Sequence, residues 1–134
     1  MRSAQMLVNL DGIMGTGQEV GPVRFWTFTA PEGTDANGLR EMVTRGRDNA
    51  RKEIASVVLG AAVADGKVSL VAATNEAGRG AGASANKVLQ AALPAVSGRG
   101  GGKDDMAQGG GTDVSGIEAA FTAAVESVKA SVGL

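Results

Sequence analysis

The residues best suited to specific chemistry lie in a glycine-rich segment, residues 98–111, with the sequence GRGGGKDDMAQGGG. Seven of these residues are glycine, and Arg99 and Lys103 place two cations among them. Glycine lets another molecule approach the main chain closely, and successive unshielded N–H groups can bind an anion. The segment therefore predicts a phosphate-binding site made of main-chain amides and basic side chains, with a disordered linker as the alternative.

A second glycine-spaced segment, Gly78-x-Gly80-x-x-Ala83, fits the G-x-G-x-x-G/A pattern of dinucleotide-binding loops. That pattern follows the first strand of a βαβ unit, whereas the strand expected here is the second arm of a hairpin. The acid that would bind the ribose, about 20 residues later, would fall in the glycine-rich segment instead of at a strand end. We therefore expect no cofactor in this domain and keep only Arg79 as a candidate phosphate contact beside a helix start.

Side chains capable of catalysis are scarce. The chain has no His and no Cys, which excludes a Ser-His-Asp triad, a thiol nucleophile and a zinc site of the usual kind. Asp104 follows Gly102-Lys103, so the hydroxyl that completes a P-loop is missing. Asp104, Asp105 and Asp113 alone make a weak case for metal binding or acid–base catalysis. We expect no catalytic and no metal-binding residues.

The charges are nearly balanced but unevenly distributed. The net charge of −1, from 13 basic and 14 acidic residues, argues against a wholly basic nucleic-acid wrapper. Residues 40–52 hold five basic residues and only two acids, and Arg40 and Arg47 would lie nearly in line on a helix. They form either a solvated helix flank or a row that faces phosphates. No apolar run approaches the roughly 18–20 residues of a membrane span, and the N-terminus is a poor secretory signal, so we expect a cytoplasmic protein.

The elements that would position these residues follow from hydrophobic periodicity and turn signals. Phe25, Trp26 and Phe28 lie in an alternating strand and are expected to pack in the core. Asp65-Gly66, between two apolar strands, predicts a hairpin with a type I′ turn. Residues 106–108 favour an ordered turn–strand–turn within the glycine-rich segment. The expected order is a helix over 3–14, a strand over 23–30, a helix over 36–49, strands over 57–63 and 68–73, a glycine-spaced loop over 78–82, a helix over 83–96, the glycine-rich segment, and a helix from 115.

Particular residues mark the ends of the helices. Asp35 is expected to cap the helix over 36–49, and Pro94 to kink or end the helix over 83–96. Ser115 is expected to start the last helix, with Glu118 completing a capping box. The fold class is therefore α/β (α+β): a mixed β-sheet with a β-hairpin, flanked by helices and preceded by a short N-terminal helix.

Residues 98–110 resemble the signature of the C-terminal domain of alanyl-tRNA synthetases, the synthetase branch of the DHH-associated domain family. The strand over 23–30, the helix containing Leu39-Arg40, the Asp65-Gly66 hairpin and the closing helix agree in order. The resemblance covers residues 20–134. It implies that residues 1–20 are the end of a helical arm or linker, and that residues 21–134 form a globular C-terminal domain of the DHH-associated type. A helix that starts almost at Met1 is also what a piece of a longer protein would show.

The resemblance implies a non-catalytic domain that binds tRNA, holds its outer corner and links aminoacylation with editing. The implied partners are the alanine tRNA, the catalytic and editing domains of the parent synthetase, and a second copy of the chain. Related phosphoesterases carry a substrate-contacting His where Lys103 stands, which argues against catalysis here. The candidate tRNA-binding residues are Arg99, Gly100, Gly101, Gly102, Lys103, Gln108, Gly109, Arg79, Lys87, Arg40 and Arg47.

Two alternative functions stay open. The small-residue strands and the amphipathic first helix could make the domain an oligomerisation module of the same enzyme. The domain could also bind substrate in a DHH-type phosphoesterase, which would need a metal-bearing partner domain. With so few cations, the isolated domain is expected to bind nucleic acid weakly and with little sequence preference.

Overall fold

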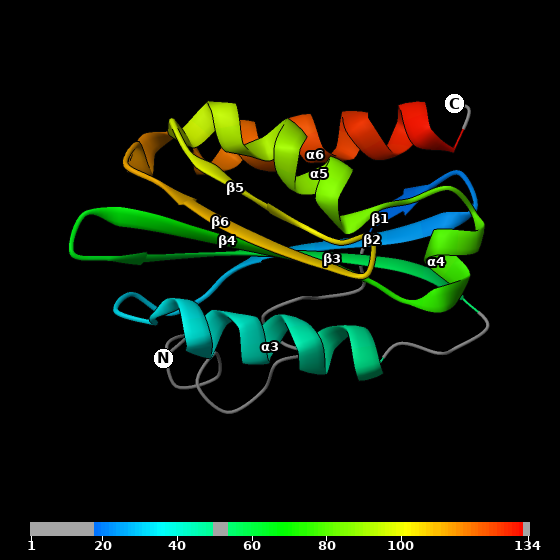
Figure 1. The fold of residues 1–134 in the computed structure, drawn as a ribbon, viewed down its shortest axis with the longest axis horizontal. Helices are drawn as coiled ribbons and strands as arrows, with labels where there is room; N and C mark the ends of the chain where they lie inside the picture. The colour runs from blue at the N-terminus through cyan, green and yellow to red at the C-terminus, as the bar shows by residue number, and fades with distance from the viewer. Residues whose placement is uncertain (1–17, 50–53, 133–134) are drawn as a thin grey trace.

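The computed structural model describes residues 18–49 and 54–132, and it has one mixed β-sheet with helices on both faces (Figure 1). The strand order is β1-β2-β3-β4-β6-β5, and β2 with β3 is the parallel pair. The predicted helix over 3–14 lies outside the described residues. The strands are β1 (Gln18–Val20), β2 (Val23–Thr29), β3 (Ala55–Ala64), β4 (Lys67–Thr74), β5 (Arg99–Gly102) and β6 (Met106–Gly111).

The helices form a layer on each side of the sheet, so the predicted fold class is confirmed (Figure 1). Helix α3 covers one face, and α5 and α6 cover the other. None of the helices in the described ranges is long and apolar enough to cross a membrane. The helices are α3 (Ala36–Asn49), α4 (Glu76–Gly80), α5 (Ala85–Ala92) and α6 (Ile117–Ser131), with short 3₁₀ helices η1 (Leu93–Val96) and η2 (Val114–Gly116).

The alternation of β2 divides the aromatic rings between two cores. Phe28 packs with Leu39 and Val43 of α3, and the partly buried Trp26 lies against the same cluster. Phe25 points to the other face, where it is only 1% exposed among residues that α5 and α6 cover. The prediction that these rings serve the core is confirmed, because neither Phe is free to stack on a base.

Three local predictions, for a turn, a helix cap and a helix end, are confirmed. Asp65 (φ 54°) and Gly66 (φ 73°) both have positive φ, as a type I′ turn requires. The Asp35 carboxylate accepts a hydrogen bond from the amide of Gly38 at 2.7 Å and so caps α3. Pro94 lies in the first turn of η1, directly after α5 ends at Ala92. These signals are local, which explains why the sequence alone reveals them.

Other predictions were wrong at the helix starts. Residues 78–80, expected in a loop, belong to α4, because the Asn75 side chain accepts from the Gly78 amide and caps a helix there. Ser115 does not start α6, because its hydroxyl donates to Asp113 and both lie at η2. Strand β1 was not predicted at all, and its Val20 is buried on the sheet, within the stretch assigned to the arm.

A substitution at Gly60 of β3 tests how tightly α3 packs on the sheet. A methyl group at this position would lie 2.7 Å from the Phe28 ring and 2.8 Å from a Val43 methyl. We expect Gly60→Ala to lower the free energy of unfolding by about 1–3 kcal/mol through overpacking, measured by urea denaturation. Gly80→Ala is the matched control, since nothing lies within 4 Å of its added methyl and alanine favours a helix. Equal stability of both variants would contradict the described packing.

Candidate nucleic-acid interface

The glycine-rich segment folds as a β5–β6 hairpin at one edge of the sheet. The two backbones approach so closely that an added Cβ at Gly102 would lie 2.5 Å from the Met106 carbonyl oxygen. An added Cβ at Gly109 would lie 2.6 Å from the Arg99 carbonyl oxygen. The segment is therefore ordered, and these glycines are required by strand packing without any ligand.

The outer edge of β5 is occupied by side chains from α5. Gln90 donates from Nε2 to the Gly100 carbonyl at 2.7 Å, and the Gly102 amide donates to Asn86 Oδ1 at 3.2 Å. The Lys103 amide donates to the Met106 carbonyl at 2.9 Å. The prediction of unshielded amides is thus wrong at Gly102 and Lys103.

Two basic side chains lie at a hollow beside this hairpin. Arg40 of α3 and Lys103, in the turn between β5 and β6, line an open hollow of about 410 Å³, called here the Arg40–Lys103 hollow. Both residues are exposed. Within the described residues neither forms an ion pair. The other lining residues are Gly101, Gly102, Asp105, Met106, Ala107 and Gln108.

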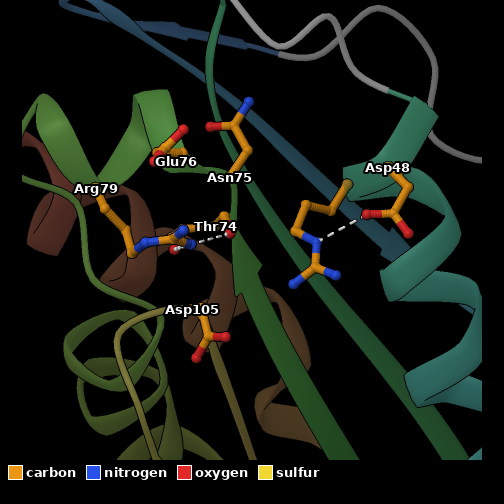
Figure 2. A pocket seen from close by; sticks show the side chains of 7 residues that line it. Asp48, Thr74, Asn75, Glu76, Arg79 and Asp105 are labelled. Atoms are coloured by element: carbon orange, nitrogen blue, oxygen red, sulfur yellow. Dashed lines mark hydrogen bonds and ion pairs between the residues drawn. The ribbon is translucent and has the colours of Figure 1, made fainter.

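A second hollow, of about 530 Å³ (Figure 2), shares the lining residue Asp105 with the first, so the two hollows adjoin each other. It is called here the Arg47–Arg79 hollow, after the basic residues that α3 and α4 contribute to it. Figure 2 shows Arg79 reaching toward Thr74, with Asp105 beside them. The remaining lining residues are Asp48, Thr74, Asn75 and Glu76.

Arg79 is fixed by the end of strand β4. Its Nη1 donates to the Thr74 carbonyl at 2.8 Å, and Thr74 is itself fully buried. The Thr74 hydroxyl donates in turn to the Asp104 carbonyl at 2.6 Å, which joins β4 to the turn that carries Lys103. A Cβ on Gly78 would lie 2.7 Å from the Ser56 carbonyl oxygen. Packing therefore accounts for this glycine without any ligand.

The structure separates the candidate residues into two groups. Lys87 is exposed on α5, which covers the opposite face of the sheet from α3, and Arg99 is exposed on β5. Neither lines a hollow described above, and neither do Gly100 and Gly109, which pair with each other. The group brought together at the two hollows is Arg40, Arg47, Arg79, Lys103, Gly101, Gly102 and Gln108.

Sequence reasoning missed the acidic and polar residues of the site. Thr74, Glu76 and Asp105 line the Arg47–Arg79 hollow, although nothing in their spacing indicates this. Their positions could have indicated the site, because a strand end and a hairpin turn that lie at the same edge of a sheet bring their polar residues together. That signal needs the strand order, which places β6 beside β4.

A pair of glycine variants tests whether the hairpin glycines serve packing. We expect Gly109→Ala to lower the free energy of unfolding by about 1–3 kcal/mol, because the added methyl group would clash with the Arg99 backbone. Gly101→Ala should cost less, since its methyl meets only the side-chain ends of Gln90, at 3.0 Å, and Asn86, at 3.3 Å. Thermal or urea unfolding of both variants measures the difference, and the reverse order of stability would show that the hairpin packs otherwise.

Comparison with known proteins identifies the family. The DHHA1 domain matches residues 23–132. The alanine–tRNA ligase of Nocardioides sp. (strain ATCC BAA-499 / JS614) is 41% identical over 124 residues, which is 91% of this chain and 14% of that protein. The alanine–tRNA ligase of Nocardia farcinica is 39% identical over 120 residues, or 90% of this chain and 13% of that protein. The chain thus spans about one seventh of these relatives.

Solved structures agree on the fold. The C-Ala domain of Aquifex aeolicus alanyl-tRNA synthetase superposes with a TM-score of 0.74 at 23% identity, covering 84% of this chain and 96% of that domain. A DHH-domain protein described as a member of the s1p family of ribosomal proteins superposes with a TM-score of 0.61 at 16% identity, covering 96% of this chain and 30% of that one. The mixed sheet, the glycine hairpin and these matches lead to one assignment: the chain belongs to the DHHA1 domain family, as a C-terminal domain of the alanyl-tRNA synthetase type.

Proposed function

We propose that this domain binds tRNA without catalysing a reaction, and that it holds the outer corner of the alanine tRNA for its parent enzyme. The observation that carries the proposal is the convergence of Arg40, Arg47, Arg79 and Lys103 on two adjoining hollows. Contacts to a phosphate backbone need such local cations and not a basic average. The similarity to alanine–tRNA ligases supports tRNA as the nucleic acid.

The charge at the two hollows favours weak binding. The four basic residues share these surfaces with Asp48, Glu76 and Asp105, so the local excess of positive charge is small. Weak binding is sufficient for a tethered domain, because tethering raises the effective concentration to roughly the millimolar range. The domain would then help the aminoacylation and editing domains of the parent enzyme share one tRNA.

The chemistry of alanine ligation is assigned to other parts of the parent enzyme, which acts in the cytoplasm in this proposal. This chain contains no His or Cys, and the resemblance to the DHH-associated domains implies that Lys103 stands where related phosphoesterases carry a substrate-contacting His. A phosphoesterase role is therefore not favoured. Among the described residues, Val114 is the only large hydrophobic residue classed as exposed, which gives little support to self-association as the main role.

Removal of two cations tests tRNA binding. We expect the Arg40→Ala/Lys103→Ala double variant to bind tRNA more weakly than the unchanged chain at low salt. The slope of log affinity against log salt, which is negative, should become less steep by roughly 0.7–0.9 for each phosphate contact that is lost. Lys67→Ala is the control, because Lys67 is an exposed cation at the β3–β4 hairpin and lines neither hollow. Filter binding across a salt series measures both quantities.

The outcomes separate the proposal from its alternatives. A chain that ignores tRNA at low salt would contradict the proposed function. Equal losses for Lys67→Ala and for the double variant would show non-specific attraction without an interface. Hydrolysis of a small dinucleotide by the purified chain would favour the phosphoesterase interpretation, and light scattering that detects dimers would add self-association to the function.

A further inference from the structure

The Arg47–Arg79 hollow contains polar groups that the fold has already engaged. Asn75 Oδ1 accepts from the amides of Ser56 at 2.9 Å and Gly78 at 2.7 Å, and its Nδ2 donates to the Ile54 carbonyl at 2.7 Å. The Thr74 hydroxyl donates to Asp104. These two side chains therefore shape the hollow, and a ligand would have to be recognised by the charged residues.

The charged residues offer two kinds of group. Within the described chain, Arg79 makes no ion pair, and Arg47 contacts Asp48 through Nε at 3.2 Å, which leaves both of its terminal nitrogens available. The Asp105 and Glu76 carboxylates make no hydrogen bond or ion pair within the described residues. A fitting ligand thus presents an anion to the guanidinium groups and a hydrogen-bond donor to a carboxylate.

Both arginines are held in place before a ligand arrives. The bond to the buried Thr74 fixes Arg79 (Figure 2), and the Arg47 side chain is only 21% exposed. Guanidinium groups that are fixed in this way favour bidentate contacts to phosphate or carboxylate, because less side-chain freedom is lost on binding. The hollow, at about 530 Å³, exceeds what a lone phosphate needs and falls in the range of small-molecule sites.

A ribonucleotide unit combines the required groups. Its phosphate supplies the anion, and its ribose 2′-hydroxyl supplies a donor that deoxyribose lacks. A site for phosphate alone would gain nothing from carboxylates beside its arginines, since they repel the anion. The acids in this hollow therefore favour a ligand with sugar hydroxyls over a free anion.

We propose that the Arg47–Arg79 hollow holds one ribonucleotide of the bound RNA, with its phosphate between the two guanidinium groups and its 2′-hydroxyl donating to Asp105. Asp105 is chosen over Glu76 because it lines both hollows, so it would lie beside a strand that continues toward Lys103. This inference rests on the proposed function and adds to it a subsite that distinguishes RNA from DNA.

The test uses the 134-residue chain and a uridine trinucleotide, followed by NMR of the arginine Nε–H groups. We expect the trinucleotide to shift the signals of Arg47 and Arg79, and Arg79→Gln to weaken its affinity by about tenfold or more. Arg45→Gln is the control, because Arg45 lies on α3 like Arg47 but pairs with Glu41 and lines neither hollow. The amide spectrum of each variant shows that the fold is retained.

A second arm tests the sugar contact. The deoxyuridine trinucleotide should bind about fivefold more weakly than the RNA, the value of roughly one hydrogen bond. Asp105→Ala should abolish this preference without weakening the binding of DNA. Inorganic phosphate is the third probe, and it should bind much more weakly than the RNA.

Each failure has a distinct meaning. Unshifted arginine signals, equal affinity for RNA and DNA, or phosphate binding as tight as RNA would overturn the ribonucleotide subsite. If Arg79→Gln loses the trinucleotide while the unchanged chain ignores tRNA, the subsite stands and the proposed tRNA function is wrong. If tRNA binds but the trinucleotide does not perturb Arg47 and Arg79, the function stands and the subsite is wrong.

Discussion

The site depends on the hydrogen bonds that converge on Asp104. Its carbonyl accepts from the Thr74 hydroxyl at 2.6 Å and from the Ala85 amide at 2.8 Å, and its carboxylate accepts from the Ser84 hydroxyl at 2.7 Å. These bonds join the end of β4, the start of α5 and the turn between β5 and β6. Arg79 is fastened to Thr74, and Lys103 precedes Asp104, so these bonds position the Arg79 side chain and the backbone of Lys103 relative to each other. The turn is thereby tied to the edge of the sheet.

The sheet also decides which cations can act together. Helix α3 places Arg40 and Arg47 near the β4–β6 side of one face, whereas α5 carries Lys87 on the other face. A rigid ligand that lies along the two hollows would therefore contact α3, α4 and the hairpin turn, and leave Lys87 in solvent. In the proposed function, the acids in the same surface would limit the affinity and would accept hydrogen bonds from donors on the ligand. Tethering would then supply the binding strength, and the local chemistry would supply the selectivity.

Sequence reasoning was accurate where the information is local. The type I′ turn at Asp65-Gly66, the Asp35 cap and the division of rings along β2 each depend on neighbouring residues, and each is confirmed. It was wrong where a distant partner decides the outcome. The Gly102 amide was expected to be open, but Asn86 reaches it from α5, and no pattern near residue 102 indicates that contact. Likewise, Arg40 and Arg47 line the two hollows only because the strand order places β6 beside β4. The sequence alone does not reveal that order. The roles of the candidate residues in binding stay predictions.

The side chains of Asn86 and Gln90 on the outer edge of β5 have a consequence for the behaviour of the domain in solution. A glycine-rich edge strand carries no bulky groups that would hinder the approach of a strand from another molecule, so it is an inviting template for intermolecular pairing and aggregation. The amide groups from α5 occupy the Gly100 carbonyl and the Gly102 amide that such a strand would use. The glycines of β5 can thus lie at the rim of the sheet while α5 covers two of the main-chain groups through which a neighbouring molecule would pair.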